Sequence, residues 1–370
     1  MKIATLSVVS VCMLFVSPHG ASATYDSNGV AETKVYGIQQ ITTMVDEEYN
    51  LGFRLQGQSS QGQRFEAKYG GSIVYGTMSN GSGTAAYNNA LTNEWDSLIF
   101  SSSGEPLPSD DVSMMLDLHW GLQKTVEFFH LLGDVHVGQG ELPVQGNIYT
   151  YSCNRYGQAF PSTNVICFGD DYGNTLPQPV IDVIGHEVTH LVYSAKDLSG
   201  GVGPGFYEGL TDLFGVAIKR HFLPESTYVF GEDRIDGGIA YTCGTESQRI
   251  RDLSQPVVST YKGPSWDANI NCAYAVGSLI NFWYYLLSEG GEGVNEHGDS
   301  YSVTGFGENF TGAYIAYQTF ERFPSQDYMD LPNYAELSIP IAEELAGPTG
   351  KATICDAWFA VGIEAVACTD

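Results

Sequence analysis

The stretch that decides the fold is His186-Glu187-Val188-Thr189-His190, which is followed eighteen residues later by Glu208 in a Phe-Tyr-Glu-Gly-Leu-Thr-Asp segment. On a helix, positions i and i+4 lie on one face, so His186 and His190 can direct two imidazoles at one point. Glu208 would add a carboxylate from a second helix. Two His, one carboxylate and one open position are the ligand set of a catalytic zinc ion. The sequence therefore predicts a zinc site at these three residues.

Glu187 stands beside the expected ligands, where its carboxylate can accept a proton from water without binding the metal. The competing interpretation is a chance motif, because a buried His is more often a core residue than a ligand. Two His at helical spacing, Glu187 between them and Glu208 downstream together favour the zinc site.

The first residues of the chain have the composition of a secretory signal. Lys2 precedes the apolar stretch 3–16, and Ala21-Ser22-Ala23 is a small-residue triplet typical of a cleavage site. We expect residues 1–23 to be a signal peptide and the protein to be secreted. An N-terminal membrane anchor is the less favoured alternative, and no later stretch is apolar enough to span a bilayer.

The chain is strongly acidic, with a formal net charge of −27. This charge argues against nucleic acids and anionic membrane surfaces as partners, and we expect a monomer that acts on a protein or peptide. Six cysteines follow residue 23, and an even number in an exported chain indicates disulfides. Fifteen pairings are open, of which we favour the local ones. The favoured pairs are Cys153–Cys167, Cys243–Cys272 and Cys355–Cys368.

Secondary-structure signals divide the chain into a β-rich first half and a helical second half. Strands are expected over 35–38 and 72–75, with strand character over 146–169. Helices are expected over 110–132, 181–195, 205–221, 272–288, 312–323, 334–345 and 353–361. We therefore expect an α+β fold of two lobes, 24–195 and 196–370, with the site in the cleft between them.

Several segments resemble the thermolysin-like zinc metallopeptidases, the gluzincins with HExxH and a distant Glu. The segments that carry the resemblance are Asp117–Gly121, Gln158–Asp170, Asp182–His190, Glu208–Gly215, Ile250–Pro256 and Asn281–Gly291. The resemblance covers nearly all of the chain after residue 23. It implies a two-lobed fold and a secreted endopeptidase.

Carried over residue by residue, the resemblance assigns roles around the metal. His186, His190 and Glu208 would bind zinc, and Glu187 would be the general base. Asp212 would orient a ligating imidazole.

The same resemblance assigns contacts with an extended peptide. Arg251 would reach a substrate carbonyl, with a surface salt bridge as the plainer alternative, and Gln158 and Ala159 would bind substrate backbone along an edge strand. Val183, Ile250 and Leu176 would form an apolar pocket for the residue after the scissile bond, although each taken singly also fits plain core packing.

The sequence departs from the family at the oxyanion donor and at the calcium positions. Tyr274 stands where the family has a His, and its hydroxyl can also donate to an oxyanion, while Asn269 replaces the Asp that supports that His. Asp182 and Glu232 match calcium ligands. Lys219 occupies a third such position, so at most one calcium ion is expected there.

Two functions stay open from the sequence. The leading one is a secreted zinc endopeptidase that favours an apolar residue after the scissile bond. The alternative is a secreted binding or effector protein that keeps zinc for structure, which Tyr274, Asn269 and Lys219 favour. The intact Glu187 argues for the enzyme, since a structural zinc ion needs no base.

Overall fold

The computed structural model describes most of the chain after residue 23. The described residues are 24–46, 52–70, 83–88, 93–95, 100–101, 109–138, 140–150, 153, 157–169, 178–196, 201–203, 205–234 and 251–369. The expected signal peptide, the expected strand 72–75, Leu176, Ile250 and Cys243 all lie outside these ranges.

The first half of the chain forms one large sheet. Its strands are β1 Thr24–Thr33, β2 Gly37–Asp46, β3 Gly52–Arg54, β4 Gln56–Gln58, β5 Arg64–Tyr69, β6 Thr84–Asn88, β7 Glu94–Trp95, β8 Phe100–Ser101, β9 Val144–Ile148, β10 Gln158–Phe160 and β11 Val165–Phe168. The order across the sheet is β10-β11-β9-β5-β6-β3-β2-β1-β7, with β4 paired to β5 and β8 to β6. Among the described strands, β10 is therefore an edge, and it pairs antiparallel with β11.

Helices form the second half. They are α1 Ser109–Leu132, α2 Ile181–Ala195, α3 Phe206–Phe222, α4 Pro264–Asn269, α5 Ala273–Glu289, α6 Asn309–Arg322 and α7 Leu331–Ala360, with short 3-10 turns η2 Pro161–Thr163 and η3 Val366–Cys368. A small hairpin of β12 Gly291–Val294 and β13 Ser300–Val303 follows α5. No helix in the described part of the chain is long and apolar enough to cross a bilayer.

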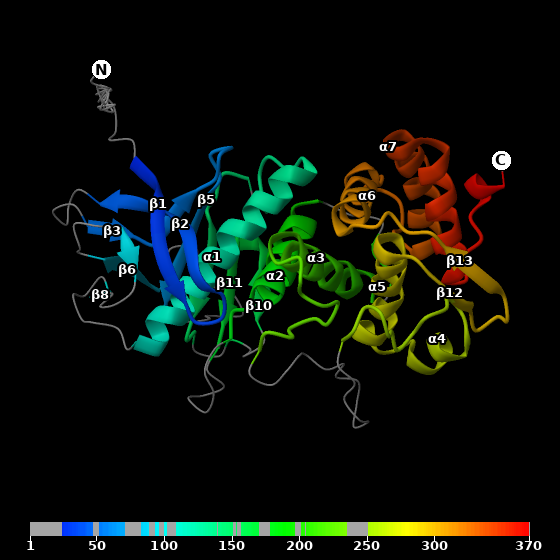
Figure 1. Ribbon diagram of the computed structural model, residues 1–370, viewed down its shortest axis with the longest axis horizontal. Coiled ribbons are helices and arrows are strands. Elements are labelled where there is room, and N and C mark those ends of the chain that lie inside the picture. The colour runs from blue at the N-terminus through cyan, green and yellow to red at the C-terminus, as the bar shows by residue number, and fades with distance from the viewer. Residues whose placement is uncertain are drawn as a thin grey trace, which may run out of the picture.

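The two halves lie along the long axis of the molecule, with α1, α2 and α3 between the sheet and the remaining helices (Figure 1). The predicted α+β fold, β-rich first and helical second, is confirmed. One hydrophobic cluster runs from Ala31 in β1 to Ala365 near the C-terminus, so the core is continuous through both halves. The lobe boundary at 195/196 stays a prediction.

Most predicted helices are found within a few residues of their expected ends, but one strand prediction was wrong in part. Val35 and Tyr36 lie in the turn between β1 and β2 rather than in a strand, because Gly37 takes a φ of 65° that tightens this turn. The two helices expected over 334–345 and 353–361 are found as the two parts of α7, which are separated by a kink at Gly347, where φ is also 65°.

The described disulfides are the local ones. Cys153 is bonded to Cys167, which lies in β11, and Cys355 of α7 is bonded to Cys368. The third favoured pair includes Cys243 and lies outside the described residues.

Candidate metal centre

Close packing of α2 against α3 brings the predicted ligands together. A Cβ atom on Gly215 of α3 would lie 2.3 Å from the carbonyl oxygen of Asp182 in α2, and one on Gly185 would lie 3.1 Å from the Gly215 Cα. Any larger side chain at either position would push the two helices apart. The glycines therefore permit the separation at which side chains of both helices can share one ion.

The three predicted ligand atoms form a small triangle. His186 Nε2 lies 3.2 Å from His190 Nε2 and 3.5 Å from Glu208 Oε2, and His190 Nε2 lies 3.9 Å from Glu208 Oε2. Ligands held about 2.0–2.2 Å from one tetrahedral ion lie roughly 3.4 Å apart. The triangle thus has the size that a zinc ion requires.

The donor chemistry also fits zinc. Glu208 Oε2 is buried and has no hydrogen-bond partner among the described residues, which is costly for a carboxylate oxygen unless a cation meets it. Burial, and secondarily the neighbouring His186, lowers the pKa of His190 to about 3, so this imidazole is neutral at pH 7 and can offer a lone pair.

A buried network orients His186. Its Nδ1 lies 2.9 Å from Asp212 Oδ1, and the same oxygen accepts a hydrogen bond from Arg251 Nη1 at 2.9 Å. Asn281 Nδ2 donates to the other Asp212 oxygen at 3.4 Å. Burial raises the pKa of Asp212, but the charges of Arg251 and His186 outweigh it and hold this pKa below its usual value. Asp212 therefore stays ionised and fixes the imidazole so that Nε2 faces the ligand triangle.

Glu187 lies on the rim of the triangle without belonging to it. It lines a cavity of about 500 Å³ together with the three ligands. Burial raises the pKa of Glu187 to about 7, which suits a group that must take up and release a proton near neutral pH. Gly157 touches it closely, because a Cβ atom there would lie 2.6 Å from Glu187 Oε1.

The cavity runs along the edge strand β10. Its other lining residues are Gly157, Gln158, Ala159, Pro161, Ser194 and Tyr274. Gln158 and Ala159 thus lie where the sequence predicted contact with an extended peptide. Val183 is buried on α2 and is not among the lining residues.

Tyr274 and Arg251 pack on each other at one wall. The Arg251 guanidinium carbon lies 4.1 Å from the centre of the Tyr274 ring and 5.3 Å from that of Phe230. The side-chain amide of Asn269 donates a hydrogen bond to the carbonyl of Ser265 within α4. Among the described residues, Tyr274 is therefore supported by Arg251.

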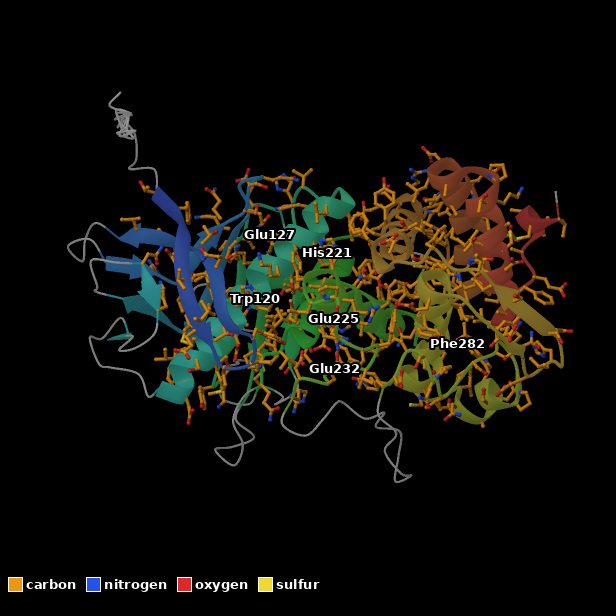
Figure 2. The ribbon with its side chains drawn as sticks, viewed as in Figure 1. Trp120, Glu127, His221, Glu225, Glu232 and Phe282 are labelled. Atoms are coloured by element: carbon orange, nitrogen blue, oxygen red, sulfur yellow. A yellow bond between two sulfur atoms is a disulfide. The ribbon has the colours of Figure 1, made fainter. Side chains whose placement is uncertain are left out.

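The expected calcium position is filled by the chain itself. Lys219 Nζ lies 3.0 Å from Asp182 Oδ2, 2.8 Å from Glu232 Oε1 and 2.7 Å from the Val229 carbonyl oxygen. Glu232, labelled in Figure 2, follows α3 in the chain. The expectation of calcium at Asp182 and Glu232 is not supported, because a buried ammonium already forms an ion pair with each carboxylate.

Three contacts of the site had no counterpart among the predictions from the sequence. They are the approach of Gly157 to Glu187, the bond from Asn281 to Asp212, and the stacking of Phe230 on Arg251. Each joins residues that are far apart in sequence. The only local signal was Gly157 itself, a glycine directly before an edge strand.

Comparison with known proteins agrees with this geometry. The sequence profile of the thermolysin metallopeptidase catalytic domain matches residues 56–194. The transglutaminase-activating metalloprotease of Streptomyces mobaraensis is 25% identical over 337 residues, which cover 80% of this chain and 42% of that protein. Bacillolysin of Bacillus caldolyticus is 28% identical over 224 residues, covering 56% of this chain and 38% of that protein.

Among solved structures, the precursor of protealysin, a metalloproteinase from Serratia proteamaculans, matches with a TM-score of 0.50 and 18% identity, over 71% of this chain and 82% of that one. This likeness concerns the fold alone. The chain spans about two fifths of the length of the curated relatives given above. The chain is thus similar to the thermolysin-like metallopeptidases, whose catalytic-domain profile it matches over residues 56–194.

Proposed function

We propose that this protein is a secreted, zinc-dependent endopeptidase. The observation that carries the proposal is the cluster of His186, His190 and Glu208, whose ligand atoms all lie within 4.8 Å of one another, beside the carboxylate of Glu187. A zinc ion held by these residues would polarise a peptide carbonyl and make water more acidic. Export is supported by the disulfides and by the signal-like composition of residues 1–23.

The chain's own residues supply the proton transfer. Glu187 lines the same cavity as the ligands, so it can accept a proton from water there and return it to the amine that leaves. Its raised pKa allows both steps near pH 7.

The substrate backbone would lie along β10. An extended peptide can add to this edge as a further strand, next to Gln158 and Ala159, which line the cavity. The Tyr274 hydroxyl would donate a hydrogen bond to the developing oxyanion, and Arg251 would support the adjacent carbonyl. Leu176 and Ile250, which lie outside the described residues, would give a preference for an apolar residue after the scissile bond, with Val183 packed behind them on α2.

The second candidate is a non-catalytic binding or effector protein on the same scaffold. Arg251 donates a hydrogen bond to Asp212 and packs on the Tyr274 ring. These contacts favour the second candidate, because they give Arg251 and Tyr274 a structural role. Glu187 opposes it, since its carboxyl is buried beside the cavity and has no ion pair with another described residue, which is costly and which the role of a general base would explain.

Metal analysis and a peptide assay separate the two candidates. Mass spectrometry of the purified protein should find one zinc ion per chain, and cleavage of quenched-fluorescent peptides should stop when a chelator is added. Glu187→Gln should keep the zinc and lower kcat by about 100- to 10,000-fold. Wild type that holds zinc and is as inert as Glu187→Gln would favour the binding protein, and absence of zinc would refute both.

A further inference from the structure

A second cavity, of about 190 Å³, lies in the helical half of the molecule. It is formed where the beginnings of α3 and α7 meet the segment that contains α4. Its lining residues are Gly203, Phe206, Tyr261, Trp266, Tyr328, Asp330 and Leu331.

This cavity is separate from the metal centre. Phe206 and Glu208 are two positions apart on α3, so their side chains leave the helix in directions about 200° apart. Glu208 faces the ligand triangle, whereas Phe206 packs at 5.0 Å on the ring of Tyr334 in α7. A ligand in the second cavity would therefore not touch the metal ligands.

The walls of the cavity are aromatic and held in place. Trp266 is 8% exposed and meets Tyr261 edge to face, with ring centres 5.0 Å apart. Tyr328 is 46% exposed and stands at the rim. Its segment is fixed by two backbone hydrogen bonds, from Met329 to Gly201 and from Gly203 to Met329. The site is thus formed before any ligand arrives.

Asp330 is the charged side chain among the described residues that line this cavity. One of its oxygens, Oδ1, accepts a hydrogen bond from Asn333 N and caps α7. The N-terminus of a helix carries roughly half a positive charge, which a full carboxylate charge exceeds. Together with the net charge of −27, this leaves a negative potential that favours a cation.

Aromatic faces beside a carboxylate recognise organic cations. A guanidinium stacks on aromatic rings and pairs with a carboxylate through its planar fork, and it loses little solvation on entering such a site. The Tyr261 ring already forms one cation–π contact, since Lys262 Nζ lies 4.9 Å from its ring centre. Lys262 is exposed and is not among the lining residues, so the cavity side of the site stays open to another cation.

We propose that this cavity binds the side chain of an arginine residue of a polypeptide. Trp266 and Tyr261 would stack on the guanidinium, and Asp330 would accept its hydrogen bonds. The site does not depend on the proposed peptidase activity: it would serve a protein substrate or a protein partner in the same way.

Two small probes of nearly the same shape, one charged and one neutral, test the proposal. N-acetyl-arginine methylamide and the corresponding citrulline compound, its neutral isostere, are titrated against the whole protein and followed by ligand-observed NMR. We expect the arginine probe to bind about 10-fold more tightly than the citrulline probe. Equal binding of the two probes, or no saturable binding, would overturn the proposal.

Paired variants locate the binding. Asp330→Asn keeps an N-cap acceptor and removes the charge, and it should abolish the preference for arginine. Asp327→Asn removes a charge from an exposed residue three positions away that does not line the cavity, and it should preserve the preference. Equal losses in both variants would mean general attraction to an acidic protein and would overturn the site.

Two further variants separate this site from the metal centre. Trp266→Leu should weaken the arginine probe about 10-fold, because one stacking face is lost. Glu187→Gln should leave its binding unchanged whether or not the wild type cleaves peptides. If Glu187→Gln instead removes arginine binding, the probe occupies the metal-site cavity and the second site is refuted.

Discussion

At the scale of single residues, Gly157 controls the position of Glu187. Its φ is +115°, and a Cβ atom there would meet Glu187 Oε1 at 2.6 Å. Gly157→Ala should therefore displace the carboxylate and lower kcat by about 100-fold or more while zinc is retained, because the base contributes at least that factor. Peptide hydrolysis and metal content measure the two effects.

Gly298→Ala is the matched control for that change. Its φ is +92°, and a Cβ atom there would meet no atom within 4 Å. It carries a similar backbone strain, of about 1–3 kcal/mol, without touching the site. If both variants lose activity equally, strain rather than contact with Glu187 is responsible.

The role of the Tyr274 hydroxyl can be tested by removing its oxygen atom alone. Tyr274→Phe keeps the ring over Arg251 and removes the hydroxyl, so the melting temperature should stay unchanged. If the hydroxyl stabilises the oxyanion, kcat should fall about 100- to 1000-fold with little change in KM. Unchanged kcat would show that Tyr274 serves only to pack against Arg251.

At the scale of elements, Lys219 ties α2, α3 and the segment after α3 together. Its ammonium is fully buried and contacts Asp182, Glu232 and the Val229 carbonyl. Lys219→Met should destabilise the protein by about 3–5 kcal/mol, because it leaves two carboxylates without their partner. Urea unfolding measures this loss.

An exposed pair gives the control for Lys219. Lys351 and Glu343 lie 3.9 Å apart with side chains 27% and 48% exposed, so Lys351→Met should cost less than about 1 kcal/mol. Calcium, or its removal by a selective chelator, should leave the wild-type melting temperature unchanged, since the ammonium already occupies the position. A clear rise in melting temperature with calcium would contradict this assignment.

Asp117 couples α1 to the turn between β1 and β2 in a pH-dependent way. It accepts a hydrogen bond from Val35 N, yet burial raises its pKa to about 7. A carboxyl with a raised folded pKa contributes stability that is full below the unfolded pKa and is lost as pH rises through about 7. The free energy of unfolding of Asp117→Asn, relative to that of the wild type, should therefore rise by about 2 kcal/mol between about pH 5.5 and about pH 8.

Urea unfolding at both pH values checks the Asp117 prediction. Asp267→Asn, at an exposed position of α4, is the control and should follow the wild type at both. A variant Asp117→Asn whose advantage does not grow with pH would contradict the raised pKa.

The sequence predicted elements better than contacts. The helix that carries His186 and His190 was expected over 181–195 and occupies those residues, because apolar positions recur along one face. The turn at Val35 was missed because a β-branched residue and a Tyr favour a strand, whereas Gly37 decides the backbone.

The parts of the site that local patterns could not predict all depend on tertiary packing. The ligand spacing within α2 follows from helical geometry, so the His pair was predictable. The approach of Gly157 to Glu187, the bond from Asn281 to Asp212 and the aromatic cavity around Trp266 join distant segments. No periodicity in one sequence carries information on such pairs.

At the scale of the whole molecule, α3 connects the two halves. Phe214 on α3 is fully buried. Its ring centre lies 5.7 Å from that of Phe129 in α1, 6.0 Å from that of Tyr193 in α2 and 6.5 Å from that of Tyr317 in α6. The hydrophobic cluster that contains it extends through the sheet and the C-terminal helices. Because one cluster of buried residues extends through both halves, the two predicted lobes should not unfold independently.

Calorimetry tests whether the halves unfold together. The wild type should show one transition, and Phe214→Ala should lower its midpoint without splitting it, at a cost of about 3–5 kcal/mol for the lost side chain and the cavity left behind. Phe282→Ala is the control: Phe282, labelled on α5 in Figure 2, is only partly buried and stacks on Tyr285. Phe282→Ala should destabilise the protein clearly less, because removal of a partly exposed ring leaves no enclosed cavity. Two separate transitions in the wild type would show instead that the halves are independent lobes, and Phe214 would then contribute to one of them only.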